Sequence, residues 1–217
     1  MRLFRSRAIR QGCALLSFMT SVALPFASAQ VLEFESGGLK YQAQTRQGIT
    51  VMVAPLPTRI LGYAIIQVGV SNGSVEPQMI APEGFIFHRM TPAPATVKAL
   101  SARAVVGDVL NRAGRNDVGR LIGVYEAALF GNSNLELRHG YEARRKDAMA
   151  VGSTRMRAAA AAAAIVMGSR TLESGQSMDG AVFFPNSNKA LGAGRLRVEI
   201  AGETFEFVLE AEPVVTR

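Results

Sequence analysis

The stretch RLRVEIAGETFEFVL, residues 195–209, decides the fold class of this chain. In its first half, the apolar residues Leu196, Val198 and Ile200 alternate with charged ones, and in its second half Phe205 and Phe207 flank a glutamate. Successive side chains of a strand point to opposite faces of a sheet. The alternation therefore predicts two antiparallel strands with one face on the core and one in water, joined by a turn at 201–203.

The first third of the chain predicts more strands of the same kind. Residues 41–45 and 49–53 alternate on either side of Gly48 and predict a hairpin. We expect Pro55 and Pro57 to end its second strand, because proline cannot donate to a sheet ladder. Further strands are predicted at 63–70, 75–80, 85–87 and 178–185, which gives six to eight strands in all.

The periodicity becomes helical after Thr91-Pro92-Ala93-Pro94. Apolar residues recur at helical spacing over 102–113 and 118–129 and predict a helical hairpin. A third helix is expected over 135–150, and a fourth from Ser153 through the seven alanines at 158–164. The prediction is an α+β fold in which a helical insertion at about 96–170 covers one edge or end of a β-sandwich.

Three pieces occur in order along the chain: VGVSNGS at 68–74, PEGF at 82–85 and LESGQSMDGAVFF at 172–184. Together they resemble the secreted bacterial immunoglobulin-like domains of unknown function. The resemblance implies an immunoglobulin-like antiparallel β-sandwich in the cell envelope and no catalytic residue. The helical insertion departs from that pattern, since such domains have a short connection in its place.

Residues 1–29 have the organisation of a secretory signal peptide. Four arginines precede an apolar run over 13–24, and Ala27-Ser28-Ala29 precedes Gln30. The run is shorter than the roughly 20 residues of a membrane span, so we expect cleavage near Ala29 and a periplasmic or secreted product. The mature chain, 30–217, is expected to form a single domain.

Composition argues against metal sites, cofactors and a nucleic-acid partner. Loss of residues 1–29 removes the single cysteine, and with two histidines in the chain we expect no metal site and no cofactor. It also lowers the net charge from +7 to +3. Because aromatic residues are few and no stacking motif is present, we expect no nucleic-acid partner.

The remaining positive charge is concentrated in the helical insertion. Residues 98–170 hold twelve lysines or arginines against six acids. Five arginines near its third and fourth helices are the candidate contacts for an anionic lipid or lipopolysaccharide surface: Arg138, Arg144, Arg145, Arg155 and Arg157. The leading hypothesis is a non-enzymatic exported cell-envelope protein, binding or structural, whose partner is such a surface or another envelope protein.

The alternative hypothesis is an envelope hydrolase that uses His139 as base with Glu142 or Asp147. No serine in a strained turn stands out as the nucleophile that such an enzyme needs. Glu142 is also four residues before Lys146, a spacing that favours an ordinary helical ion pair. We therefore expect no catalytic residue.

The second predicted helix has small residues four positions apart: Gly119, Gly123 and Ala127. Small residues at this spacing let helices approach closely. The pattern predicts either packing within the molecule or self-association into a homo-oligomer.

Overall fold

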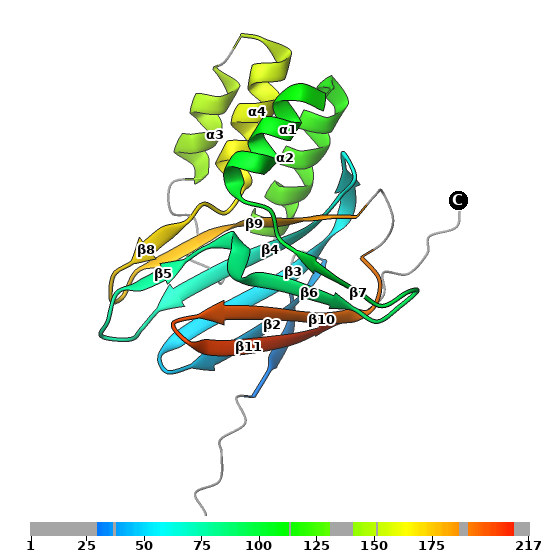
Figure 1. Cartoon of the computed structure of the whole chain (residues 1–217). Helices are drawn as coiled ribbons and strands as arrows, with labels where there is room; N and C mark the ends of the chain where they lie inside the picture. Colours follow the sequence, from blue (N-terminus) through cyan, green and yellow to red (C-terminus); the bar gives the residue numbers. More distant parts are fainter. Residues whose placement is uncertain are drawn as a thin grey trace, which may run out of the picture.

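The computed structural model describes residues 30–36, 38–112, 114–130, 141–150, 152–186 and 191–210, with only the backbone at 58, 59, 115, 118, 124, 127–130, 154 and 155. The chain forms three layers (Figure 1): four helices lie on a five-stranded sheet, and a four-stranded sheet lies on the other face of that sheet. The α+β prediction with helices inserted mid-chain is confirmed.

All pairs between the named strands are antiparallel. The five-stranded sheet has the order β1 (Leu32–Ser36), β2 (Leu39–Arg46), β3 (Ile49–Ile60), β4 (Tyr63–Asn72), β9 (Ser177–Pro185). The four-stranded sheet has the order β11 (Glu203–Leu209), β10 (Gly194–Ile200), β6 (Phe85–Arg89), β7 (Ala95–Lys98). A small sheet pairs β5 (Gln78–Ile80) with β8 (Arg170–Leu172), and the 3-10 turn η1 (Pro82–Gly84) leads into β6.

The two larger sheets share a dry core. Alternate residues of β3, β4 and β9 meet the inward face of β6, β10 and β11, where Phe85, Phe205 and Phe207 are fully buried. The predicted hairpin at 195–209 is confirmed, with Leu196 opposite Phe207 and Val198 opposite Phe205. Its charged residues face outward, as the alternation required.

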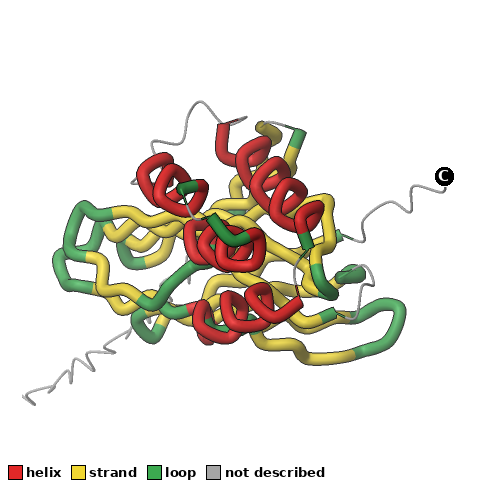
Figure 2. The backbone as a smooth tube through the Cα atoms, turned by 90° about the horizontal axis from the view of Figure 1, so that it is seen from above, coloured by secondary structure: helices red, strands yellow, loops and turns green. Residues whose placement is uncertain are grey.

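The other face of the five-stranded sheet is covered by the helices α1 (Ala102–Arg112), α2 (Arg115–Phe130), α3 (Tyr141–Met149) and α4 (Thr154–Ile165). Figure 2 shows the helices lying across this face. Leu56, Ile65 and Phe183 of the sheet pack there against Val105, Leu121 and Ala162 of the helices. The expectation that the insertion covers an edge or an end is therefore wrong, because the helices bury a whole apolar face.

Local signals explain where the helices begin. The Ser101 hydroxyl accepts a hydrogen bond from the Ala104 amide (3.3 Å) at the start of α1. The Asp117 carboxylate accepts one from the Gly114 amide (3.0 Å), the back-reaching half of a capping box for α2. Ser153 occupies the N-cap of α4 as predicted, but its side chain makes no capping bond.

Several predicted boundaries were wrong. β3 continues through Pro55 and Pro57 to Ile60, because its register with β4 is interrupted between residues 55 and 59, where paired amides are not required. The insertion becomes helical at residue 102, since 95–98 form β7 beside β6. The strand predicted at 75–80 covers only 78–80, and the described residues form eleven strands where six to eight were expected. The third predicted helix, 135–150, is observed as α3 from Tyr141 to Met149, and residues 131–140 lie outside the described residues.

The four-stranded sheet is joined to β2 at its open edge. The Gln44 amide group donates to the Glu206 carbonyl (2.8 Å) and accepts from the Glu206 amide (3.2 Å), as a neighbouring strand would. Gln42 donates to the Val208 carbonyl (2.8 Å). These side chains satisfy part of an edge that would otherwise be open to another chain.

The strand order bears on the immunoglobulin-like resemblance. β1 to β4 are consecutive neighbours in one sheet. In the immunoglobulin fold, consecutive strands are divided between the two sheets in an A-B-E-D and C-F-G arrangement. The layers therefore agree with a β-sandwich, while an immunoglobulin-like order of strands is not established. Among the described residues, no helix is both long and apolar enough to cross a membrane.

Candidate functional site

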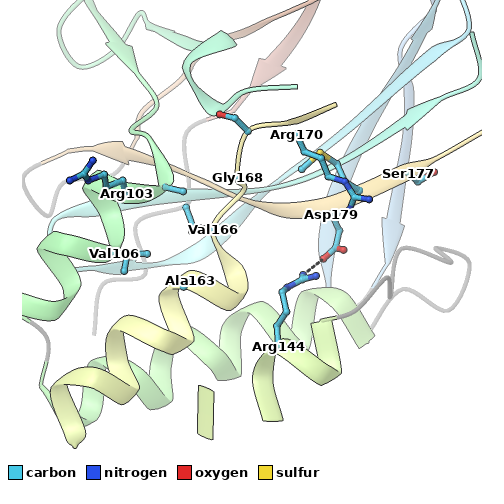
Figure 3. A pocket seen from close by; sticks show the side chains of 12 residues that line it. Arg103, Val106, Arg144, Ala163, Val166, Gly168, Arg170, Ser177 and Asp179 are labelled. Carbon is cyan, nitrogen blue, oxygen red and sulfur yellow. Dashed lines mark ion pairs between the residues drawn. The ribbon is translucent and has the colours of Figure 1, made fainter. Parts of the chain in front are cut away.

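A pocket of about 510 Å³ opens where the helical layer meets the start of β9. We call it the junction pocket. Its wall is built by the start of α1, by α3, by the end of α4 with the segment that follows it, and by the start of β9 (Figure 3). The lining residues are Ala102, Arg103, Val106, Arg144, Ala163, Val166, Gly168, Ser169, Arg170, Ser177, Met178 and Asp179.

A close backbone approach holds this segment against β9. The Met167 amide donates to the Ala181 carbonyl (2.8 Å). A Cβ on Gly180 would lie 2.9 Å from the Met167 Cα, so only glycine fits there without a shift. The contact fixes the neighbouring residues Val166 and Gly168 as part of the pocket wall.

Asp179 is the buried charge of the junction pocket. It follows the alternation of β9 and faces the helical layer, where its side chain is 2 % exposed. The Tyr125 hydroxyl donates to its Oδ2 at 2.7 Å. A guanidinium nitrogen of Arg144 lies 3.9 Å from the same oxygen. Burial and then the charge of Asp179 raise the pKa of Tyr125 well above its ordinary value, so the phenol stays a donor to the carboxylate.

Arg144 is also held by the end of α4. Its Nε donates to the Ala164 carbonyl at 3.1 Å. The last carbonyls of a helix have no partner within the helix and attract cations. The sheet carboxylate and this helix end together aim the Arg144 guanidinium at the junction pocket, as Figure 3 shows.

A second polar cluster lies between α3 and α2. The Tyr141 hydroxyl donates to Glu126 Oε1 (3.3 Å), and Arg145 forms an ion pair with the same carboxylate. Burial, followed by the charge of Glu126, raises the pKa of Tyr141. The rings of Tyr141 and Tyr125 lie 5.1 Å apart, so the two clusters are in contact.

The charge of the junction pocket favours an anion. Three arginines from three elements, Arg103, Arg144 and Arg170, line it together with a single carboxylate. Arg144 and Arg170 lie on the same side as Asp179, whereas Arg103 lies at the far side (Figure 3). Arg103 and Arg170 are exposed, and within the described part of the chain neither side chain has a hydrogen bond or an ion pair. Guanidinium groups of this kind bind carboxylates and phosphates.

Of the five predicted arginines, the structure describes the side chains of Arg144, Arg145 and Arg157, and these have different surroundings. Arg144 lines the junction pocket, whereas Arg145 turns to Glu126 on α2. Arg157 is half-buried and has a partner. Arg138 and the side chain of Arg155 lie outside what the structure describes.

The small-residue spacing does not serve internal packing where it is described. Gly119 and Gly123 are exposed on α2, and a Cβ added to either would meet no atom within 4 Å. The side chain of Ala127 lies outside the described set. Self-association through this face stays a prediction.

Of the residues of the alternative hypothesis, the two that the structure describes, Glu142 and Asp147, do not line the junction pocket. Glu142 and Asp147 are exposed on α3, and His139 lies outside the described residues. The predicted pair of Glu142 with Lys146 does not form, although both side chains are described. Among the described residues, no group of histidines, cysteines or acids is arranged to hold a metal.

Sequence reasoning missed three of the four charged residues that line the junction pocket: Arg103, Arg170 and Asp179. One signal was present for the third of them. Asp179 is the only charged residue in MDGAVFF, 178–184, a run whose strand is buried on both faces. A lone carboxylate in such a strand requires a buried partner. No comparable signal distinguishes Arg103 or Arg170 from other surface arginines.

The chain matches no protein-family model, no curated protein and no solved structure at a significant level.

Proposed function

We propose that this protein is a non-enzymatic, exported cell-envelope protein that binds an anionic envelope component at the junction pocket. The observation that carries the proposal is that Arg103, Arg144 and Arg170, from three separate elements, line one pocket of about 510 Å³. That volume lies within the range of small-molecule sites, about 300–1,000 Å³. The anionic group of a lipid or of lipopolysaccharide is the ligand chemistry that fits.

The arrangement suits binding because its central cation is preorganised. Arg144 is oriented by Asp179 and by the Ala164 carbonyl before any ligand arrives. A guanidinium that is already held loses less conformational freedom when it binds an anion. The twelve cations of residues 98–170 add a longer-range attraction for negatively charged surfaces.

The same proposal includes export and fold family. Export rests on the N-terminal arginines, the apolar run and the small residues before Gln30. An immunoglobulin-like relationship rests on the two packed antiparallel sheets and on the strand and turn pieces of the sequence. In that relationship the first four strands form an unusual meander and the helices form a third layer.

Export is tested by expressing the full chain in a Gram-negative host and sequencing the N-terminus of the protein in the periplasmic fraction. We expect the mature protein to begin at Gln30, and Leu16→Arg, which interrupts the apolar run, to leave a cytoplasmic precursor. An intact N-terminus on the periplasmic protein, or unchanged export of the Leu16→Arg variant, would contradict this part of the proposal.

Binding is tested with point variants, since removing the helices would expose the apolar face of the five-stranded sheet. The purified protein is mixed with vesicles of phosphatidylglycerol, vesicles of phosphatidylcholine, or lipopolysaccharide across a salt series. Each of Arg103→Gln and Arg170→Gln is expected to weaken binding to the anionic surfaces about fivefold, the equivalent of about 1 kcal/mol. Salt should weaken the wild-type interaction.

Arg120→Gln is the matched control, because Arg120 is exposed on α2 and does not line the junction pocket. Equal losses in all three variants would mean that only net charge matters. That result, or equal binding to both kinds of vesicle, would refute the junction pocket as the binding site.

A further inference from the structure

We propose that the ligand of the junction pocket is a single-chain anionic amphiphile, with a phosphate or carboxylate head beside Arg144 and Arg170 and an apolar tail along the helical wall. This inference rests on the proposed anion-binding function and adds the second half of the ligand. It follows from a feature independent of charge: between Arg144 and Arg170 on one side and Arg103 on the other, the pocket is lined by apolar side chains.

The apolar wall consists of side chains from the start of α1 and from the end of α4 with the residue that follows it. Its members are Ala102, Val106, Ala163 and Val166. Val106 and Val166 are partly exposed, although both touch the buried cluster beneath the helices. Hydrocarbon that stays in contact with water is the kind of surface that a ligand tail covers favourably.

Ala163 differs in exposure from its neighbours on α4. Its neighbours Ala161, Ala162 and Ala164 on α4 are buried, whereas Ala163 is exposed and lines the junction pocket. An alanine run allows close packing on all sides, and here one methyl group is left uncovered. The end of α4 therefore presents a smooth apolar surface to the space inside the pocket.

Head and tail positions follow from how these residues lie. In Figure 3, Arg144, Arg170 and Asp179 gather at one side, and the wall formed by Val166, Ala163 and Val106 extends away from them. A ligand with its anion at the arginines has its chain directed along this wall.

The size of the pocket points to one chain. About 510 Å³ is in the lower half of the range for small-molecule sites, about 300–1,000 Å³. We infer that a free single-chain anion, such as an alkyl phosphate or fatty carboxylate, fits the pocket better than a two-chain lipid, which would present only its head there while its chains stay in a bilayer. Both sources carry the same head chemistry, so the experiment separates them by the tail.

The first measurement compares butyl, hexyl and octyl phosphate by titration calorimetry with the purified protein, below the concentrations at which they form micelles. Burial of each added methylene is expected to lower the Kd about fourfold until the pocket is filled. Equal Kd values for butyl and octyl phosphate, with both lost in Arg170→Gln, would overturn the amphiphile and leave the anion-binding function standing. Failure of every phosphate to bind, or binding unaffected by Arg170→Gln, would instead refute the proposed function.

The second measurement fills the pocket. Ala163→Leu adds apolar volume at an exposed helical position, so we expect the variant to fold, to bind octyl phosphate at least tenfold more weakly, and to bind butyl phosphate nearly unchanged. Ala104→Leu is the matched control, since Ala104 is exposed on α1 and does not line the pocket. Equal effects of the two leucines would overturn the inference. So would weakened binding of phosphatidylglycerol vesicles by Ala163→Leu without any effect on octyl phosphate, because the tail contact would then belong to a bilayer lipid.

Discussion

The two faces of the five-stranded sheet are stabilised by different chemistry. The core shared with the four-stranded sheet contains Phe85, Phe87, Phe184, Phe205 and Phe207, whereas all four tyrosines of the chain lie in the cluster on the helical side. Each tyrosine hydroxyl donates to a different side chain: Tyr41 to Gln67, Tyr63 to Asp108, Tyr125 to Asp179 and Tyr141 to Glu126. The sheet side is packed hydrocarbon, and the helical side combines hydrocarbon with a set of polar bonds.

This difference explains why the candidate binding site lies on the helical side. A buried hydrogen-bonded phenol specifies the position of its partner, while apolar packing specifies only shape and volume. The helical side therefore holds Asp179 and Arg144 in fixed places next to the junction pocket. The sheet side supports the strands that carry them.

The largest effect is expected in the dry core. Phe207→Ala removes a fully buried ring between the two sheets, and both lost burial and the cavity left behind lower the free energy of unfolding by about 3–5 kcal/mol. Val208→Thr is the control, because Val208 is 56 % exposed on the same strand and a change there costs within about 0.5 kcal/mol. Urea denaturation checks both values. A loss under about 1 kcal/mol for Phe207→Ala would mean that the sheets do not share a packed core.

A smaller loss is expected on the helical side. Tyr125→Phe keeps the ring but removes a donor from a carboxylate whose side chain is 2 % exposed, so we expect a cost of about 1–3 kcal/mol. Tyr141→Phe should cost less, about 0.5–1 kcal/mol, since Glu126 keeps its ion pair with Arg145. The same urea experiment ranks the two variants. Equal costs would show that Asp179 does not depend on the Tyr125 hydroxyl.

Sequence periodicity predicted the parts of the fold in which one local pattern repeats. The alternation at 195–209 gave the correct hairpin, and the helical stripes at 102–113 and 118–129 gave α1 and α2. It failed where tertiary structure overrides a local rule. Pro55 and Pro57 remain within β3 because the ladder is irregular there, and β7 follows a Pro-rich turn that was expected to end sheet pairing.

The candidate site was harder to predict because its residues come from separate elements. The charge pattern of the sequence predicts Arg144 and Arg145 alike as contacts for an anion. In the structure, however, the two side chains pair with acids on different elements. The partner of Arg144 lies 35 residues further along the chain on β9, and one-dimensional charge patterning contains no record of that contact. Only the isolated position of Asp179 in an apolar strand hinted at it.

The tyrosines also predict a response to alkaline pH. Burial first, then the charges of neighbouring carboxylates and the hydrogen bonds to them, raise the pKa values of Tyr63, Tyr125 and Tyr141 in the folded protein. A raised folded pKa means that the stabilisation is fully present below about pH 10, the unperturbed value, and is lost as the pH rises beyond it. We expect these three phenols to ionise at a higher pH than an exposed tyrosine, as followed by phenolate absorbance beside circular dichroism. Four phenols that titrate together near pH 10 in a folded protein would contradict the buried polar layer.

The smallest effect is expected on the outer side of the helical layer, where α2 faces solvent. Gly119 and Gly123 are exposed, and a Cβ at either position meets no atom within 4 Å. Glycine inside a helix costs about 0.5–1 kcal/mol relative to alanine, so Gly119→Ala and Gly123→Ala should each raise the free energy of unfolding by that amount. Measurements over a range of protein concentrations separate helix propensity from self-association. If α2 pairs with a second copy through these glycines, the added methyl groups push the helices apart, and alanine lowers the stability at high concentration while it raises it at low concentration.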